Sequence, residues 1–379
     1  MSRTTAARSV SPLARLFPNG FDPLAILLRG RAFFALIAII IIFSMLSPNY
    51  FNIGNLLQMS QHVAVYALLA IGMLFVVLNG GIDLSVGATL GFSGVIAGFL
   101  MQGVTIPELG IAFYPSVWVV VVITVAAGAF VGWINGILIS RFKVAPFVAT
   151  LGMMYVVRGA GLLITGGLTY PNVDGDEALG NTGFDYLGFN NFFGLPIGVL
   201  VMIVVAIIAS LMLNKAPFGR WLYASGGNER AAELSGIPVK KVQVRVYVIA
   251  GICSAFAGII IASELTSANP TAGDTFELTA IAAVVIGGAS LAGGNGTIRG
   301  TLLGAFVIGF LADGLVIVGV SAYWQMVFKG AVIVLAVMLN AIEYKGRKAK
   351  AAAVPPTPTA SSASQRDTSV DAAGAKNAG

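Results

Sequence analysis

Charged side chains are scarce in this chain. Only 10% of its 379 residues are Asp, Glu, Lys or Arg, whereas 57% are hydrophobic, and the mean hydropathy is +0.89. Because about a quarter of the residues of a soluble domain are charged, the composition excludes a soluble protein. The net charge of +6 does not indicate nucleic acid, since Lys and Arg lie at the ends of apolar runs rather than among aromatic residues. The composition predicts a polytopic membrane protein of the all-α class.

Reactive side chains are scarce as well. The single cysteine, Cys253, lies within an apolar run, so we expect a buried hydrophobic residue rather than a reactive thiol. The single histidine, His62, has no cysteine or second histidine for a metal site and no carboxylate near it in sequence. The dipeptide Gly-Lys, which a phosphate-binding P-loop requires, does not occur in the sequence. We therefore expect no catalysis, no metal and no cofactor in this chain. If ATP drives the protein, another polypeptide binds the ATP and its Mg.

Apolar runs recur along the chain at the length that a membrane requires. A hydrocarbon core about 30 Å thick needs about 20 residues per helix. Residues 31–342 are expected to form the transmembrane domain, between a segment 1–30 and a disordered tail 343–379 that is poor in large apolar residues. The eighth run is so rich in glycine that we expect it to be broken or to span only part of the membrane. The ten runs are 31–47, 59–78, 84–103, 116–139, 145–165, 192–213, 246–263, 277–292, 300–320 and 324–342.

Basic residues predict the orientation of these helices, because cytoplasmic loops collect Lys and Arg. If the first helix starts inside, all of the 22 Lys and Arg fall on the cytoplasmic side except Arg158 and Lys329, which lie within helices. Both termini are therefore expected in the cytoplasm. The longest external loop, 166–191, is acidic and is expected to help dock a partner. Its acids are Asp174, Asp176, Glu177 and Asp185.

One hydrophilic segment, residues 214–245, interrupts the apolar runs and falls on the predicted cytoplasmic side. A short run of charged and small residues at its centre, followed by Gly236 and Pro238, predicts a short helix that docks onto another subunit. Small alanines allow a partner to approach closely, and Glu229 and Glu233 share a face. A solvated connector is the alternative. The residues expected to couple to a partner are Asn228, Glu229, Arg230, Ala231, Ala232, Glu233 and Gly236.

Glycine is abundant, with 47 residues, and much of it recurs four residues apart, which allows helices to pack closely. Closely packed helices lined by glycine can shift with little steric cost, as a gated pathway requires. Gly80-Gly81 and Gly293-Gly294 occur in two segments that match register for register, which indicates a weak internal repeat. The candidate pathway or gate residues are Asn79, Gly80, Gly81, Asp83, Asn135, Gly287, Gly288, Gly293 and Gly294.

Three charged residues lie within predicted helices: Arg158, Asp313 and Lys329. Each costs about 2.5–3.5 kcal/mol on insertion scales unless it meets a partner or water. All three fall in the outer half of the membrane on the predicted topology, so we expect Asp313 to form an ion pair with one of the two bases. Asp83 lies at a boundary, where we expect it to cap the helix that begins near Leu84.

Three motifs together resemble the inner-membrane permease subunits of bacterial ABC importers for monosaccharides, of the ribose, xylose and arabinose type. They are NGGIDLSVGA at 79–88, GGNERAAELSGI at 226–237 and VVIGGASLAGGNGTIRGTLLGA at 284–305. The resemblance covers most of residues 45–342. The Ala-Ala-x-x-x-Gly coupling element of such permeases falls on Ala231, Ala232 and Gly236. Arg230 departs from it, since the family carries Glu there.

The resemblance implies an assembly in a bacterial inner membrane. Two permease subunits, identical or paralogous, would form one pathway, with two ATPase domains beneath and a periplasmic sugar-binding protein above. A monosaccharide would cross by alternating access, driven by ATP.

Other classes of transporter stay open. A related importer for a branched-chain amino acid or a polyol fits the composition, although the scarcity of central charge favours a neutral sugar over a zwitterion. An ion-coupled secondary transporter would need a central acid, and Asp313 is the candidate.

Overall fold

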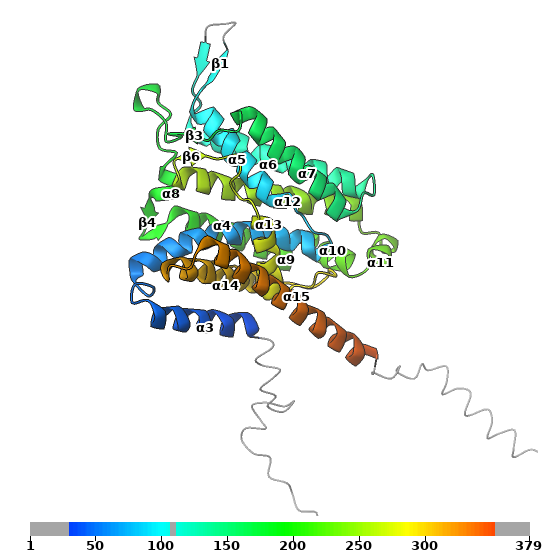
Figure 1. Cartoon of the computed structure of the whole chain (residues 1–379). Helices are drawn as coiled ribbons and strands as arrows, with labels where there is room; N and C mark the ends of the chain where they lie inside the picture. Colours follow the sequence, from blue (N-terminus) through cyan, green and yellow to red (C-terminus); the bar gives the residue numbers. More distant parts are fainter. Residues whose placement is uncertain (1–29, 107–110, 353–379) are drawn as a thin grey trace, which may run out of the picture. The chain divides into compact units, whose positions relative to one another are not determined.

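The computed structural model describes residues 30–106 and 111–352, and each of the ten predicted runs contains an apolar helix (Figure 1). Six of these helices in the described residues are long and apolar enough to cross a membrane, and four are shorter. The chain is therefore a multi-pass, all-α membrane protein, as predicted. The long helices are α4 (Ile53–Leu78), α6 (Val117–Ser140), α7 (Pro146–Thr165), α9 (Ile197–Asn214), α12 (Val239–Glu264) and α14 (Ile298–Ile317). The shorter ones are α3 (Arg31–Leu46), α5 (Val86–Met101), α13 (Phe276–Ile286) and the apolar part Ala322–Leu335 of α15 (Ala322–Ala352).

Helix α13 is the shortest of the ten. Its 11 residues rise about 16 Å, roughly half of a hydrocarbon core. The helix ends at two glycines, and Gly288 has a φ of +90°, a left-handed conformation that cannot continue the helix. The chain then returns to α14 without further helix. The short helix agrees with the prediction that the eighth run is broken or spans only part of the membrane.

Helices α4 and α12 form the centre of the packed core. Both are largely buried, and α12 packs against α4, α5 and α6. By contrast, only a third or less of α6, α7 and α9 is buried, and large apolar side chains such as Trp118 and Leu163 are exposed on them. Apolar side chains at such positions suit contact with lipid.

Glycines bring α6 and α12 into backbone contact. A Cβ added at Gly136 would lie 2.7 Å from Cα of Val244, and one at Gly128 would lie 2.6 Å from the carbonyl oxygen of Gly251. Between them, Gly132 meets the carbonyl oxygen of Tyr247. The close packing predicted from the four-residue glycine spacing is confirmed at this pair of helices.

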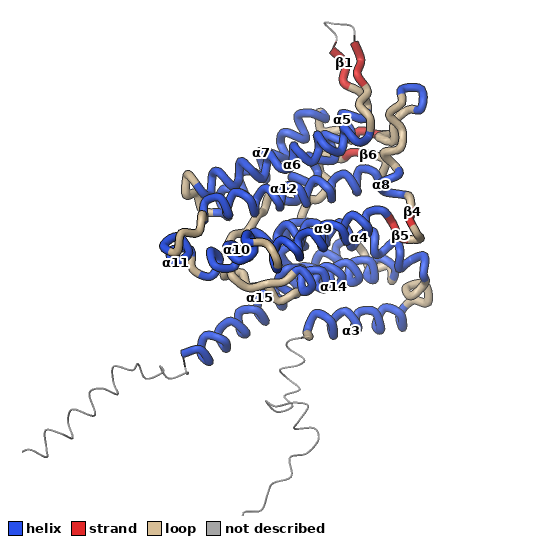
Figure 2. The backbone as a smooth tube through the Cα atoms, turned by 180° about the vertical axis from the view of Figure 1, so that it is seen from behind, coloured by secondary structure: helices blue, strands red, loops and turns tan. Residues whose placement is uncertain are grey.

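Short strands and short helices occupy the two ends of the helices. All strand pairs lie at one end together with α8 (Tyr186–Phe189), whereas α10 (Pro217–Gly227) and α11 (Glu229–Leu234) lie at the other (Figures 1 and 2). This arrangement agrees with the prediction that the acidic loop and the hydrophilic segment lie on opposite sides of the membrane. The antiparallel pairs are β1 (Val104–Ile106) with β2 (Ile111–Phe113), β3 (Tyr170–Pro171) with β6 (Ser267–Ala268), and β4 (Asn191–Phe192) with β5 (Leu195–Pro196). A 3₁₀ helix, η2 (Glu177–Leu179), lies in the acidic loop.

The boundaries that differ most from the prediction are those of α12 and α15. Helix α12 begins at Val239 rather than at 246, because its amphipathic first turns extend beyond the apolar run. Helix α15 continues to Ala352, past the predicted end at 342. The chain divides into two units, 1–337 and 338–379, and that boundary falls inside α15. Nearly all of the predicted segment 1–30 and most of the predicted tail lie outside the described residues.

Candidate functional site

The hydrophilic segment is mostly helical. Pro217 starts α10 with the fixed φ that suits a first helical position. Asn228 then ends α10 and begins α11, since its side chain accepts a hydrogen bond from the backbone N–H of Ala231 at 3.0 Å. The predicted short helix is present, as the second of two consecutive helices rather than as a helix within a loop.

Gly236 ends α11. Its φ of +80° is left-handed, its N–H donates to the carbonyl of Glu233, and the N–H of Ile237 donates to the carbonyl of Ala232, both at 3.0 Å. These two hydrogen bonds form a Schellman cap, which glycine favours because it has no Cβ. Pro238 follows, and α12 begins at once. The cap gives α11 a defined end and direction.

Helix α11 presents one face to its own chain and another to solvent. Ala232 is buried, whereas Arg230, Ala231 and Leu234 are exposed, and Leu234 exposes 76% of its surface. Glu229 is exposed as well, but its carboxylate lies 3.6 Å from Nζ of Lys143 and accepts a hydrogen bond from Gln243 at 3.3 Å. Of the predicted coupling residues, Glu229 is therefore bonded within its own chain, and Arg230 pairs with Glu233 at 3.3 Å. Ala231 and Leu234 remain exposed on α11.

The predicted glycine pairs meet beside α10. A Cβ added at Gly293 would lie 3.1 Å from the backbone nitrogen of Gly80 and 2.5 Å from the carbonyl oxygen of Gly226. The N–H of Gly294 donates to the carbonyl of Leu78, at the end of α4, at 2.9 Å. Two loops from distant parts of the sequence thus touch each other and the last turn of α10, and no side chain separates them.

Side chains strengthen this contact. The hydroxyl of Tyr223 on α10 donates to the carbonyl of Gly296 at 2.8 Å, and the hydroxyl of Ser225 donates to Oδ1 of Asn79 at 3.4 Å. Helix α10 is therefore tied to the end of α4 and to the loop that leads into α14. Gly287 lies apart, against the backbone of Gly300.

Asp83 and Asn135 are buried, with exposed fractions of 2% and 0%. Asp83 accepts hydrogen bonds from the N–H and the hydroxyl of Ser85, at 2.9 and 2.6 Å, and Asn135 donates to the same hydroxyl at 2.9 Å. Burial raises the pKa of Asp83, in the turn between α4 and α5, to about 6. The expected cap is not formed, because α5 begins at Val86 and Asp83 bonds a residue before it. Both side chains hold the turn and face no open space.

The expected ion pair of Asp313 with Arg158 or Lys329 is wrong. Asp313 lies instead 3.1 Å from Nδ1 of His62. Arg158 donates to the carbonyls of Pro270 and Ala272, both at 2.8 Å. The cause is helix packing: α7 packs against α5 and α6, whereas α14 packs against α4, α13 and α3. No ion pair involving Lys329 is found among the described residues.

His62 therefore belongs to a cluster that the sequence did not indicate. Its Nε2 lies 3.5 Å from Oε1 of Glu264, so the ring bridges acids from α12 and α14. One turn further along α4, Tyr66 meets Phe276 edge to face, with ring centroids 5.0 Å apart. The cluster is partly open, since the His62 side chain is 39% exposed. His62 and Asp313 are 251 positions apart, so no local spacing could have paired them.

Comparison with known proteins identifies the family of the chain. Residues 55–337 match the family described as branched-chain amino acid transport system / permease component. The chain belongs to this permease family. The matched residues include α10, α11 and the glycine loops, so the hydrophilic segment and its contacts lie within the part that matches the family.

Individual relatives are similar along most of their length. This permease is 46% identical over 312 residues to the ribose import permease protein RbsC of Bacillus subtilis, covering 81% of this chain and 91% of the relative. It is 42% identical over 321 residues to RbsC of Escherichia coli K12, covering 83% and 94%. It is 32% identical over 331 residues to the galactose/methyl galactoside import permease protein MglC of Haemophilus influenzae, covering 85% and 97%. No solved structure matches the chain.

Proposed function

We propose that this chain is the membrane-spanning permease subunit of an ATP-driven, binding-protein-dependent importer that carries a monosaccharide across a bacterial inner membrane by alternating access. The family and the sugar permeases named among its relatives support this assignment. The ATP and its Mg bind to a separate ATPase subunit, and a second permease subunit completes the pathway.

The observation that carries the mechanism is the contact of α10 with both glycine loops. An ATPase that moves α11 also moves α10, because the two helices share Asn228 as a junction. The carbonyl of Gly226 lies against Gly293, and Gly294 is bonded to Leu78, so the movement reaches the ends of α4 and α14. Direct backbone contact transmits displacement without loss in flexible side chains. The hydrophilic segment thus links the motor to the helices that open and close.

Other partners dock at the opposite end of the helices. The exposed acids Asp174, Asp176 and Glu177 surround η2 in the longest loop on that side. They suit a basic surface on the sugar-binding protein, because complementary charge steers association.

A branched-chain amino acid, from which the family takes its description, is the second candidate substrate. A binding site for the amino acid would differ in charge from a binding site for a sugar. A zwitterion needs charged partners or helix ends, whereas a sugar is satisfied by hydroxyl, amide and carboxylate groups. The relatives named for ribose and galactose favour the sugar.

Reconstitution tests the proposal. Proteoliposomes containing this permease should accumulate radiolabelled ribose or another monosaccharide only when the ATPase, the binding protein and ATP are all present. Leucine under the same conditions should not accumulate. Uphill uptake by the permease alone would assign it to the secondary transporters, and uptake of leucine instead of any sugar would reverse the substrate assignment.

A further inference from the structure

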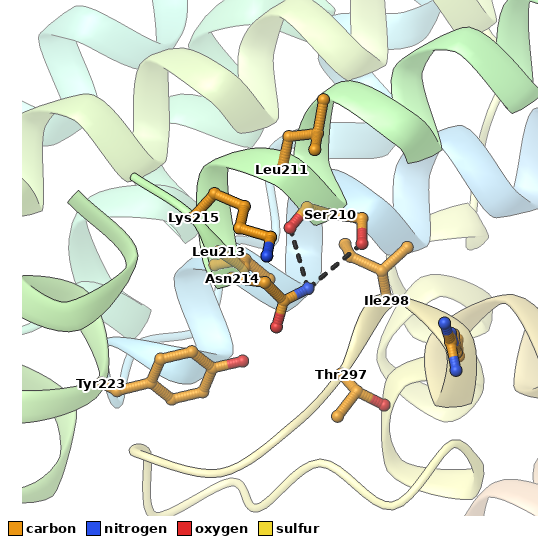
Figure 3. A pocket seen from close by; sticks show the side chains of 9 residues that line it. Ser210, Leu211, Leu213, Asn214, Lys215, Tyr223, Thr297 and Ile298 are labelled. Atoms are coloured by element: carbon orange, nitrogen blue, oxygen red, sulfur yellow. Dashed lines mark hydrogen bonds between the residues drawn. The ribbon is translucent and has the colours of Figure 1, made fainter. Parts of the chain in front are cut away.

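A cavity of about 500 Å³ lies where α9 ends, beside α10 and the start of α14 (Figure 3). Its size falls within the range of about 300–1,000 Å³ that is usual for small-molecule sites. It lies at the same end of the helices as α11, but it is built from different residues, and the proposed function assigns it no role.

The cavity carries unneutralised positive charge. Lys215 and Arg299 line it, and no acidic side chain does. Neither base takes part in an ion pair with another described residue. Both side chains are exposed and therefore available to a ligand. Two free cations on one cavity favour an anion between them.

Neutral groups in the cavity suit a phosphate ester with hydroxyls. The amide nitrogen of Asn214 donates to the carbonyl and the hydroxyl of Ser210, at 2.8 and 3.1 Å, which leaves its oxygen facing the open space (Figure 3). That oxygen can accept a hydrogen bond from a hydroxyl. Thr297 accepts from the N–H of Gly300 at 3.1 Å, so its own hydrogen is free to donate to a phosphate oxygen.

One rim of the cavity is apolar and continues onto an exposed apolar surface of α9. Leu211 lines the cavity and is 54% exposed, and Ile207 and Ile208, earlier on α9, are 54% and 52% exposed. A soluble anion would gain nothing from this rim, whereas a lipid places its acyl chains there. We propose that the cavity binds the headgroup of an anionic phospholipid from the leaflet on the α11 side, with the phosphate between Lys215 and Arg299.

Native mass spectrometry of the full-length permease tests the proposal. Phosphatidylglycerol should be retained in preference to phosphatidylcholine of the same acyl chains. Each charge removed should weaken retention about five-fold, so K215Q/R299Q should weaken it about 25-fold. The matched control is K240Q/K241Q, which removes two exposed cations at the start of α12 that do not line the cavity. The control should retain phosphatidylglycerol as the wild type does.

Three outcomes would overturn the proposal. Equal retention by the wild type and K215Q/R299Q would exclude the cavity as the site, and equal loss in both double variants would show a general effect of charge. Binding of glycerol 3-phosphate as tight as that of phosphatidylglycerol would assign the cavity to a soluble anion. Melting temperatures and gel filtration check the fold, and if the double variant misfolds, the single variants K215Q and R299Q should each show the five-fold loss.

Discussion

At the scale of single residues, two neighbouring glycines at the end of α10 differ in their surroundings. Gly226 packs against the backbone of other segments, whereas Gly227 does not. A Cβ at Gly226 would meet the carbonyl of Leu78 and lie 2.8 Å from the nitrogen of Gly294, whereas nothing lies within 4 Å of one at Gly227. We expect Gly226→Ala to destabilise the protein by about 1–3 kcal/mol, the usual cost of overpacking, and to lower ATP-driven uptake. Gly227→Ala should be neutral or stabilising by up to about 1 kcal/mol.

Thermal unfolding in detergent and uptake by proteoliposomes measure the two effects. Similar melting temperatures and uptake for the two alanine variants would show that α10 does not transmit force through its backbone contact.

The His62 cluster makes a second prediction at this scale. A hydrogen bond to a charged group contributes about 1.5–3 kcal/mol when buried, and the partial exposure of His62 reduces this to about 1 kcal/mol. A double-mutant cycle of His62→Ala and Asp313→Ala, followed by thermal unfolding, should therefore give a coupling energy of about 1 kcal/mol. The matched cycle of Arg158→Ala with Asp313→Ala should give none. A larger coupling energy in the second cycle would support the ion pair of Asp313 with Arg158 that was expected from the sequence.

At the scale of elements, the direction of α11 depends on the left-handed conformation of Gly236. No atom lies within 4 Å of a Cβ added there, so a substitution acts through the backbone alone. A left-handed conformation costs a non-glycine residue about 1–2 kcal/mol, and asparagine less than most. We expect sugar uptake per ATP hydrolysed to fall in the order Gly, Asn, Ala, Val at this position, while assembly with the ATPase persists. An order set by side-chain size alone, with Ala better than Asn, would point to a steric role instead.

The exposed face of α11 makes a prediction about binding. Leu234 is 76% exposed, and Leu168, at the opposite end of the helices, is 74% exposed. Burial of a leucine against a partner contributes about 1.5–3 kcal/mol, so Leu234→Ser should weaken binding of the ATPase about ten-fold or more. Leu168→Ser removes an equally exposed leucine and should leave that affinity unchanged. Titration of immobilised permease with the ATPase gives the dissociation constant of each variant. Equal constants for Leu234→Ser and Leu168→Ser would show that α11 is not part of the interface.

The elements also show what could be predicted from the sequence. Apolar length predicted all ten helices, and glycine spacing predicted that α6 packs closely against another helix, because both signals are local. That the other helix is α12 came from the structure. The partners of Asp313 and Arg158 depend on which helices become neighbours, and no spacing along one helix records that. The pairing of Gly293 with Gly80 was anticipated only as a likeness between two segments. Its physical basis, contact with Gly226, required the fold.

At the scale of the whole molecule, the mechanism requires α11 and the acidic loop to face opposite compartments. The structure places them at opposite ends of the helices (Figures 1 and 2), and the distribution of Lys and Arg predicts that α11 faces the cytoplasm. Cys253 makes this testable, because it is the only cysteine and is 2% exposed. Its replacement by Ala gives a background for single reporter cysteines at two exposed positions, Ser235 after α11 and Ala178 in η2.

In intact spheroplasts, a membrane-impermeant maleimide should label the Ala178→Cys variant and not the Ser235→Cys variant. After permeabilisation both should react, which shows that Ser235→Cys is accessible once the barrier is removed. The reversed pattern would place α11 outside, where no ATPase can reach it, and the coupling mechanism would fail even if the fold is correct. Labelling of both variants in intact spheroplasts would place both ends of the helices on one side, which the arrangement of α10, α11 and the strand pairs does not permit.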